Sequence, residues 1–126
     1  MAICLQESRL EYRHQLGGPA HGYAQFEQGG GVRGVLTHPA SKPHTLKVLE
    51  ALDYVPDVEY CYAAIEHNDI LGAAFARLLL YTLPELLPVR GEPEMGWFQY
   101  VKAWRPGKPH REFWNENYAN AWEAVS

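Results

Sequence analysis

The segment over residues 69–83 constrains the fold more than any other part of the chain. Its apolar side chains lie almost all round a helix, and it is bounded by Asn68, a common N-cap residue, and by Pro84, which cannot continue a helix. A helix without a polar face is normally the buried centre of a domain. Gly72 and the neighbouring alanines allow close approach, so we expect the helix around Glu7 to pack against this segment.

Most of the other apolar segments are also typical of helices. Helices are predicted from Ala2, over residues 42–52, from Pro56-Asp57, over residues 94–103 and over residues 110–124. The sequence therefore predicts an all-α, mainly helical fold with about six helices around a buried central helix. The 126 residues are expected to form a single domain over residues 1–126.

The glycine-rich stretch from Gly29 to Pro43 is expected to be a loop or small hairpin beside a cleft. Val32, Val35 and Leu36 are candidates for a short strand within it. The glycines do not indicate a phosphate-binding loop, because no strand is predicted before them and no Lys-Ser/Thr pair follows.

Composition excludes several function classes. The formal net charge of −4 argues against a general nucleic-acid binder. The sequence shows neither a signal-peptide pattern nor an apolar run of membrane-spanning length, so we expect no membrane partner. Cys4 and Cys61 are expected to be buried thiols rather than a disulfide or zinc pair. The six histidines show no H-E-x-x-H pattern, so neither a metal nor another cofactor is expected.

Glu7 is the candidate for chemistry. Ile3, Glu7, Leu10 and His14 share one face if a helix continues through them. A carboxyl among apolar neighbours has a raised pKa, as a general acid at neutral pH requires. The alternative is a solvated glutamate, favoured near a helix start by the helix dipole.

Several short motifs, in order along the chain, add a resemblance. They are Glu7-Ser8, Gly22-Tyr23-Ala24-Gln25, the stretch from His67 to Ala74, Ala103-Trp104-Arg105-Pro106-Gly107, and Asn117-Tyr118-Ala119-Asn120-Ala121. Together they resemble the lytic transglycosylases and goose-type lysozymes, most closely the phage-encoded members. That family usually has Leu-Met where Tyr23-Ala24 stands. It also generally places a helix before the catalytic one, so we expect that this chain either lacks that helix or begins at an internal start.

The resemblance implies a lysozyme-like fold and assigns roles to matching residues. Glu7 would be the single acid/base, and Ser8 would orient it or contact a substrate N-acetyl group; the alternative for Ser8 is a hydroxyl bonded back to its helix. Gln25 would line the cleft, and the alternative is a glutamine on the surface. Tyr23 would form part of an aromatic platform for a sugar, and the alternative is an ordinary core tyrosine. Trp104 replaces a family tyrosine, keeping a flat face but losing the phenolic hydroxyl. Arg105 would supply a hydrogen-bond donor in place of that lost hydroxyl, and the alternative is a solvated arginine.

The function implied is cleavage of the MurNAc-GlcNAc bond of peptidoglycan by a lytic transglycosylase or lysozyme. The partners would be glycan strands and other virion proteins, with no nucleic acid. The chain would act from a phage virion, or from the host cytoplasm with delivery to the periplasm. The alternative is a virion structural or adaptor protein with a lysozyme-like fold and little or no catalysis. The motif substitutions and the acidic charge favour this alternative, and Glu7-Ser8 and Gln25 favour the enzyme.

Overall fold

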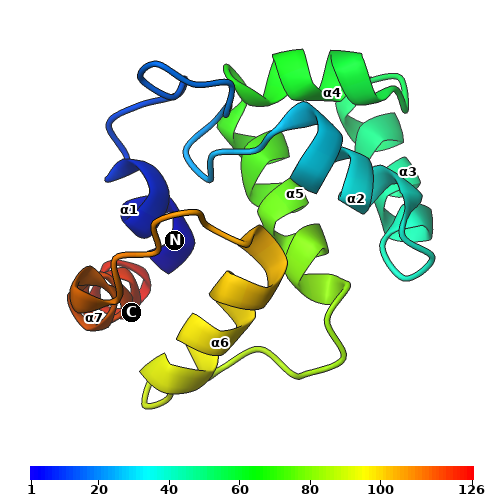
Figure 1. Ribbon diagram of the computed structural model, residues 1–126. Helices are drawn as coiled ribbons and strands as arrows, with labels where there is room; N and C mark the ends of the chain where they lie inside the picture. The colour runs from blue at the N-terminus through cyan, green and yellow to red at the C-terminus, as the bar shows by residue number, and fades with distance from the viewer.

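The computed structural model describes residues 1–126 and is mainly helical, as predicted (Figure 1). Its α-helices are α1 (Ala2–Ser8), α2 (Arg33–Thr37), α3 (Lys42–Leu52), α4 (Val58–Ile65), α5 (Asp69–Tyr81), α6 (Pro93–Trp104) and α7 (Trp114–Val125). A π-helical turn, η1 (Gln28–Val32), precedes α2, and a 3-10 turn, η2 (Arg111–Phe113), precedes α7. The seven α-helices exceed the predicted number because α2 was not expected.

Helix α5 occupies the middle of the larger part of the molecule, where α2, α3, α4 and α6 all pack against it (Figure 1). Its predicted cap is confirmed, because the Asn68 side chain accepts a hydrogen bond from the Leu71 backbone N–H at 3.1 Å. Leu71 and Phe75 are completely buried. Ile70 is 71% exposed, so one side of this apolar helix does face solvent.

Helix α1 is shorter than the sequence pattern indicated and lies elsewhere. It ends at Ser8, because Arg9 and Leu10 both adopt left-handed backbone conformations with φ of 55° and 58°. The predicted face shared by Glu7, Leu10 and His14 is therefore wrong. The expected packing partner is also wrong, since α1 packs mainly against α7 rather than α5, at the end of the molecule where both termini lie (Figure 1).

The glycine-rich stretch is helical rather than a loop or a strand. Gly29-Gly30-Gly31 lie in η1, and Val35 and Leu36 lie in α2. Val32 and Val35 are completely buried in the core. The Ser41 hydroxyl donates to the Val35 carbonyl oxygen at 2.7 Å instead of capping α3, so it ties α2 to the start of α3.

Buried side chains form two hydrophobic clusters. The larger one joins α2, α3, α4 and α5 with Ala24 and Phe26. The smaller one consists of Tyr100, Trp114 and Tyr118 from α6 and α7. Trp104, at the end of α6, packs against both clusters. The two parts of the molecule are thus joined by packing at this end of α6.

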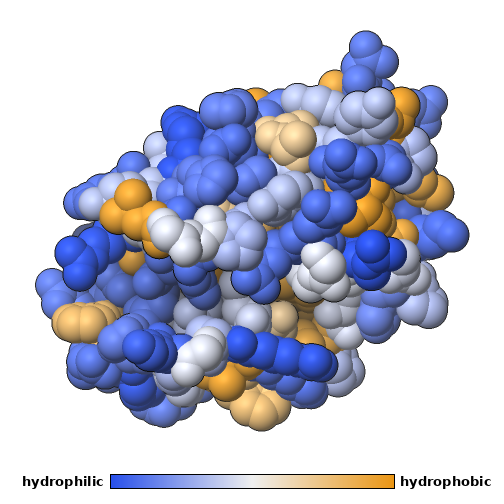
Figure 2. Space-filling view, turned by 45° about the horizontal axis from the view of Figure 1, so that its top comes forward, coloured by the Kyte–Doolittle hydropathy of each residue, from blue (hydrophilic) through white to orange (hydrophobic).

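The face of the molecule seen in Figure 2 is largely polar, and both cysteines are free thiols. The hydrophobic residues on this face lie in separate small patches (Figure 2). None of the helices has both the length and the apolar character needed to cross a membrane. Both cysteines are free; Cys61 is buried and Cys4 is half-buried, and burial raises the pKa of each thiol.

Candidate functional site

A wide groove of about 1140 Å³ is the largest concave feature around Glu7. Its lining comes from the end of α1, residues 25–34, the end of α5, the end of α6 and the connection over residues 105–110. Pockets that hold a compact small molecule usually measure roughly 300–1,000 Å³. The groove is therefore large enough for an extended ligand, and most of its lining residues are not hydrophobic.

Glu7 lines this groove from the last turn of α1, where its side chain is only partly exposed. Burial raises the pKa of this carboxyl, and the negative charge of Glu27 raises it further. A hydrogen bond from Tyr100 acts in the opposite direction without cancelling these effects. Glu7 therefore holds its proton to a higher pH than an ordinary glutamate does.

Tyr100 is the nearest chemical partner of Glu7, and sequence reasoning did not identify it. Its hydroxyl donates a hydrogen bond to Glu7 Oε1 at 2.7 Å, and the residue is only 2% exposed. Burial and the Glu7 charge raise the pKa of this phenol, so it remains a donor at neutral pH. The signal in the sequence was its position four residues before Trp104, one turn away on the same helix. Tyr100 thus places a phenol beside Glu7 from one turn before Trp104.

Trp104 and Gln25 both line the groove, and each is fixed by a hydrogen bond. Trp104 Nε1 donates to the Ala24 carbonyl oxygen at 2.8 Å, and its ring packs near Phe26. Gln25 has a left-handed backbone with φ of 56°, and its Nε2 donates to the Gly22 carbonyl oxygen at 2.9 Å. The ordered segment that carries Gln25 is therefore held against the end of α6.

Ser8 lines the groove, and of the two roles considered for it, the hydroxyl bonded back to its helix agrees with the structure. Its buried hydroxyl donates to the carbonyl oxygens of Tyr23 at 2.7 Å and Cys4 at 3.0 Å, and it accepts from the Leu10 backbone N–H at 3.3 Å. These bonds occupy the hydroxyl, so it neither orients Glu7 nor points free into the groove. Instead it fixes the end of α1 to the segment around Tyr23.

Tyr23 does not line the groove. Its ring faces the guanidinium of Arg13, with 4.7 Å between the guanidinium carbon and the ring centroid. Tyr23 is therefore not positioned to form the expected platform for a sugar in the groove. The Phe, Tyr and Trp side chains that line the groove are Tyr12, Phe26, Tyr100 and Trp104.

The groove lining includes cationic side chains although the whole chain is acidic, and one of them, Lys102, forms an ion pair with Glu85 at 3.3 Å. Arg105, Lys102 and Lys108 line the groove, and Arg105 is exposed in a left-handed conformation at the end of α6. Glu7 and Glu27 are the only carboxylates in the lining, and Glu11 lies outside it. An anionic or neutral polar ligand is thus compatible with the groove despite the net charge of −4.

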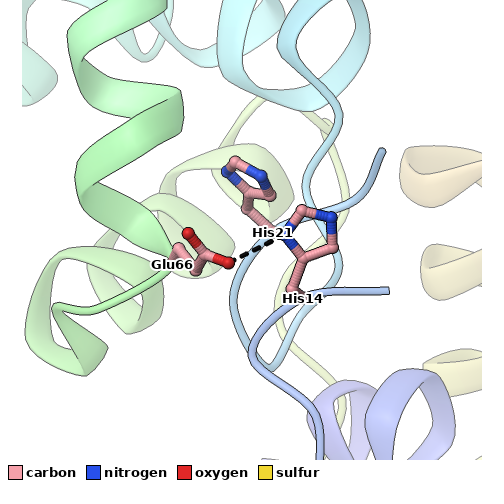
Figure 3. Close-up of side chains that lie close together, drawn as sticks. All are labelled: His14, His21 and Glu66. Carbon is pink, nitrogen blue, oxygen red and sulfur yellow. Dashed lines mark hydrogen bonds and ion pairs between the residues drawn. The ribbon is translucent and has the colours of Figure 1, made fainter. Parts of the chain in front are cut away.

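Two other features lie apart from the groove. An apolar pocket of about 250 Å³ between α1, α6 and α7 contains no carboxylate, histidine or cysteine. The only cluster of three potential metal ligands, His14, His21 and Glu66, does not line the groove either (Figure 3). The groove itself contains Glu7 and Tyr100 and, among its other titratable lining residues, Glu27, His38 and His110.

Replacing Glu7 by glutamine is expected to stabilise the folded protein near pH 7 but not near pH 4. Above the ordinary glutamate pKa of about 4.3 the unfolded chain is ionised, whereas the folded chain retains the proton until its raised pKa. Stability of the parent therefore falls as the pH rises through this range, and the Glu7→Gln substitution removes that loss. Thermal unfolding of parent and variant at both pH values measures the difference. Exposed Glu11→Gln is the matched control, and an equal advantage at both pH values would contradict the burial argument.

Comparisons of the chain with protein-family models, with curated proteins and with solved structures found no match. The observations that bear on function are therefore those of the groove: a partly buried carboxyl with a raised pKa, a buried phenol that donates to it, and a lining of aromatic and cationic side chains.

Proposed function

We propose that this protein cleaves the MurNAc-GlcNAc bonds of peptidoglycan as a lytic transglycosylase or lysozyme, with Glu7 as its acid/base. The observation that carries the proposal is the Glu7–Tyr100 pair in an open groove. Glycosidic cleavage needs a carboxyl that is protonated at working pH and can deliver its proton to the leaving oxygen. Burial raises the pKa of Glu7, which favours the protonated form that this step needs.

In the proposed reaction, Glu7 donates its proton to the glycosidic oxygen while the bond from that oxygen to the anomeric carbon breaks. The substrate N-acetyl group assists as positive charge develops on the sugar ring. The Glu7 carboxylate then takes a proton from the muramoyl 6-hydroxyl, which closes a 1,6-anhydro ring, or from water, which gives hydrolysis. Tyr100 contributes because its hydrogen bond stabilises the carboxylate that proton transfer creates.

The other groove residues would bind the glycan. Trp104 presents an aromatic ring at the lining, and Gln25 presents an amide whose orientation is fixed. Arg105 adds an exposed donor at the rim. The proposed place of action is a phage virion, or the host cytoplasm followed by delivery to the periplasm.

The direct test uses the purified full chain and isolated peptidoglycan sacculi, with released muropeptides identified by mass. Release of muropeptides with anhydro ends would establish a transglycosylase, and hydrated reducing ends would establish a lysozyme. Absence of release by a chain that circular dichroism shows to be folded would contradict the proposal. That result would favour the alternative of a virion structural or adaptor protein.

Tyr100→Phe is expected to move the alkaline limit of activity to higher pH and to lower the maximal rate by roughly 10-fold or more. The lost hydrogen bond had lowered the Glu7 pKa, so removing it raises that pKa and keeps the acid protonated to higher pH. The same loss leaves the developing carboxylate less stable. The pH profile of muropeptide release measures both effects.

Tyr118→Phe is the matched control for this prediction. Tyr118 is also buried, but its hydroxyl donates to the Val89 carbonyl oxygen and not to Glu7. An unchanged pH profile in Tyr100→Phe, or an equal shift in both variants, would remove Tyr100 from the mechanism.

A further inference from the structure

Three side chains from two separate segments lie close together between the first connecting segment and the end of α4, and one of them, His21, is buried. His14 and His21 come from the segment between α1 and η1, and Glu66 directly follows α4 (Figure 3). One potential ligand atom from each residue lies within 4.8 Å of the others. The His14 side chain is 54% exposed and the Glu66 side chain 22%, so an ion in solution can reach them.

The backbone holds the two histidines together independently of any ligand. His14 and His21 form an antiparallel bridge, with the Gly22 backbone N–H donating to the Arg13 carbonyl oxygen at 2.6 Å.

Gly22 also explains why this segment lies against α4. Its φ is +75°, and a Cβ there would lie 2.7 Å from the Ile65 side chain. The segment can therefore approach the residue before Glu66 only because position 22 has no side chain.

The hydrogen bond of His21 prepares this ring for metal ligation. Its Nδ1 lies 2.9 Å from the Tyr62 carbonyl oxygen, which can only accept, so Nδ1 carries the proton. The other ring nitrogen, Nε2, is then left with a free lone pair. The ring is buried and stacked on Tyr62, with 3.8 Å between centroids and 7° between planes. A histidine whose second nitrogen donates to a backbone carbonyl is the usual arrangement of a metal ligand.

The two carboxylate oxygens of Glu66 contact the imidazoles of His14 and of His67. Its Oε1 lies 2.8 Å from His14 Nδ1, and its Oε2 lies 3.2 Å from His67 Nε2. Ligand atoms around a tetrahedral zinc ion are about 3.4 Å apart, given zinc–ligand distances of about 2.0–2.1 Å. The ligand atoms of the three residues lie within 4.8 Å of one another, so binding would require them to move closer together.

We propose that His14, His21 and Glu66 bind one divalent transition-metal ion, of which Zn²⁺ fits best. Two imidazoles and one carboxylate form a donor set typical of zinc, whereas Ca²⁺ and Mg²⁺ prefer oxygen ligands alone. The bound ion would join the segment that leads to Gln25 to the end of α4. The ion would lie outside the groove, which these residues do not line. The metal site therefore does not depend on whether the groove cleaves peptidoglycan.

The test is titration of the chelator-treated full chain with Zn²⁺ by calorimetry, and with Co²⁺ by visible absorption. We expect one ion per chain, a higher unfolding temperature with Zn²⁺, and at least roughly 10-fold weaker binding in His14→Ala and in Glu66→Gln, as loss of one ligand predicts. These positions are chosen because buried His21 is part of the packing. Exposed His44→Ala, on α3, is the matched control and should bind as the parent does. Absence of saturable binding by the parent, or equal affinity in His14→Ala, Glu66→Gln and the parent, would overturn the site.

Discussion

Glu7→Gln is expected to reduce muropeptide release by roughly 10²–10⁴-fold, the usual contribution of a positioned general acid or base. Glutamine can still accept the hydrogen bond from Tyr100, so the local geometry is retained while the transferable proton is lost. Digestion of isolated sacculi, followed by quantification of the released fragments, measures this loss. A variant that remains folded and keeps parental activity would show that Glu7 is not the acid.

Two further glutamates make this experiment specific. Glu11→Gln makes the same charge change at an exposed position outside the groove, and its activity should match that of the parent. Glu27→Gln alters the other carboxylate of the groove, whose charge raises the Glu7 pKa. We expect only a modest loss there, since the single-acid mechanism assigns Glu27 no bond to the sugar. A loss in Glu27→Gln equal to that in Glu7→Gln would instead indicate a mechanism with two carboxylates.

Trp114→Ala is expected to destabilise the protein by about 3–5 kcal/mol, the range for truncation of a large buried aromatic residue. Trp114 is 1% exposed, and its Nε1 donates to the Pro93 carbonyl oxygen at 2.8 Å. Its ring stacks on Tyr100, with 5.3 Å between centroids and 7° between planes. The cavity would therefore also loosen the phenol that contacts Glu7. Denaturant unfolding monitored by circular dichroism measures the change in free energy.

Phe113→Ala provides the comparison for Trp114→Ala. Phe113 is the preceding residue and is 50% exposed. Its truncation should therefore change stability by only about 0.5 kcal/mol. Similar losses in the two variants would show that the small aromatic cluster is not a separate source of stability.

The sequence predicted the start of a helix correctly where a capping side chain bonds to the first turn of that same helix. Asn68 and Asp57 begin α5 and α4 because each side chain accepts a backbone hydrogen bond from the first turn that follows. The start of α3 also agrees with Pro43, whose fixed φ suits a first turn. In contrast, helical periodicity through Leu10 and His14 was misleading, since Arg9 and Leu10 leave the helix in left-handed conformations.

The candidate site was predictable only in part. Glu7 was identified from the resemblance of Glu7-Ser8 to a family motif, whereas its spacing alone favoured a solvated glutamate; burial in fact raises its pKa. Tyr100 was missed because its contact spans 93 residues of sequence. The bond of the Ser8 hydroxyl to its own helix was one of the alternatives, but its bond to the Tyr23 carbonyl oxygen was not predicted, because only folding brings that acceptor to it.

By itself, the sequence determined that this chain is mainly helical, because caps, prolines and short-range periodicity act within a turn or two. The tertiary structure decided where α1 ends, which helix it packs against, and that Tyr100 donates to Glu7. It also decided that His14, His21 and Glu66 meet. These outcomes depend on contacts between distant segments, and short-range patterns carry no information about which segments become neighbours.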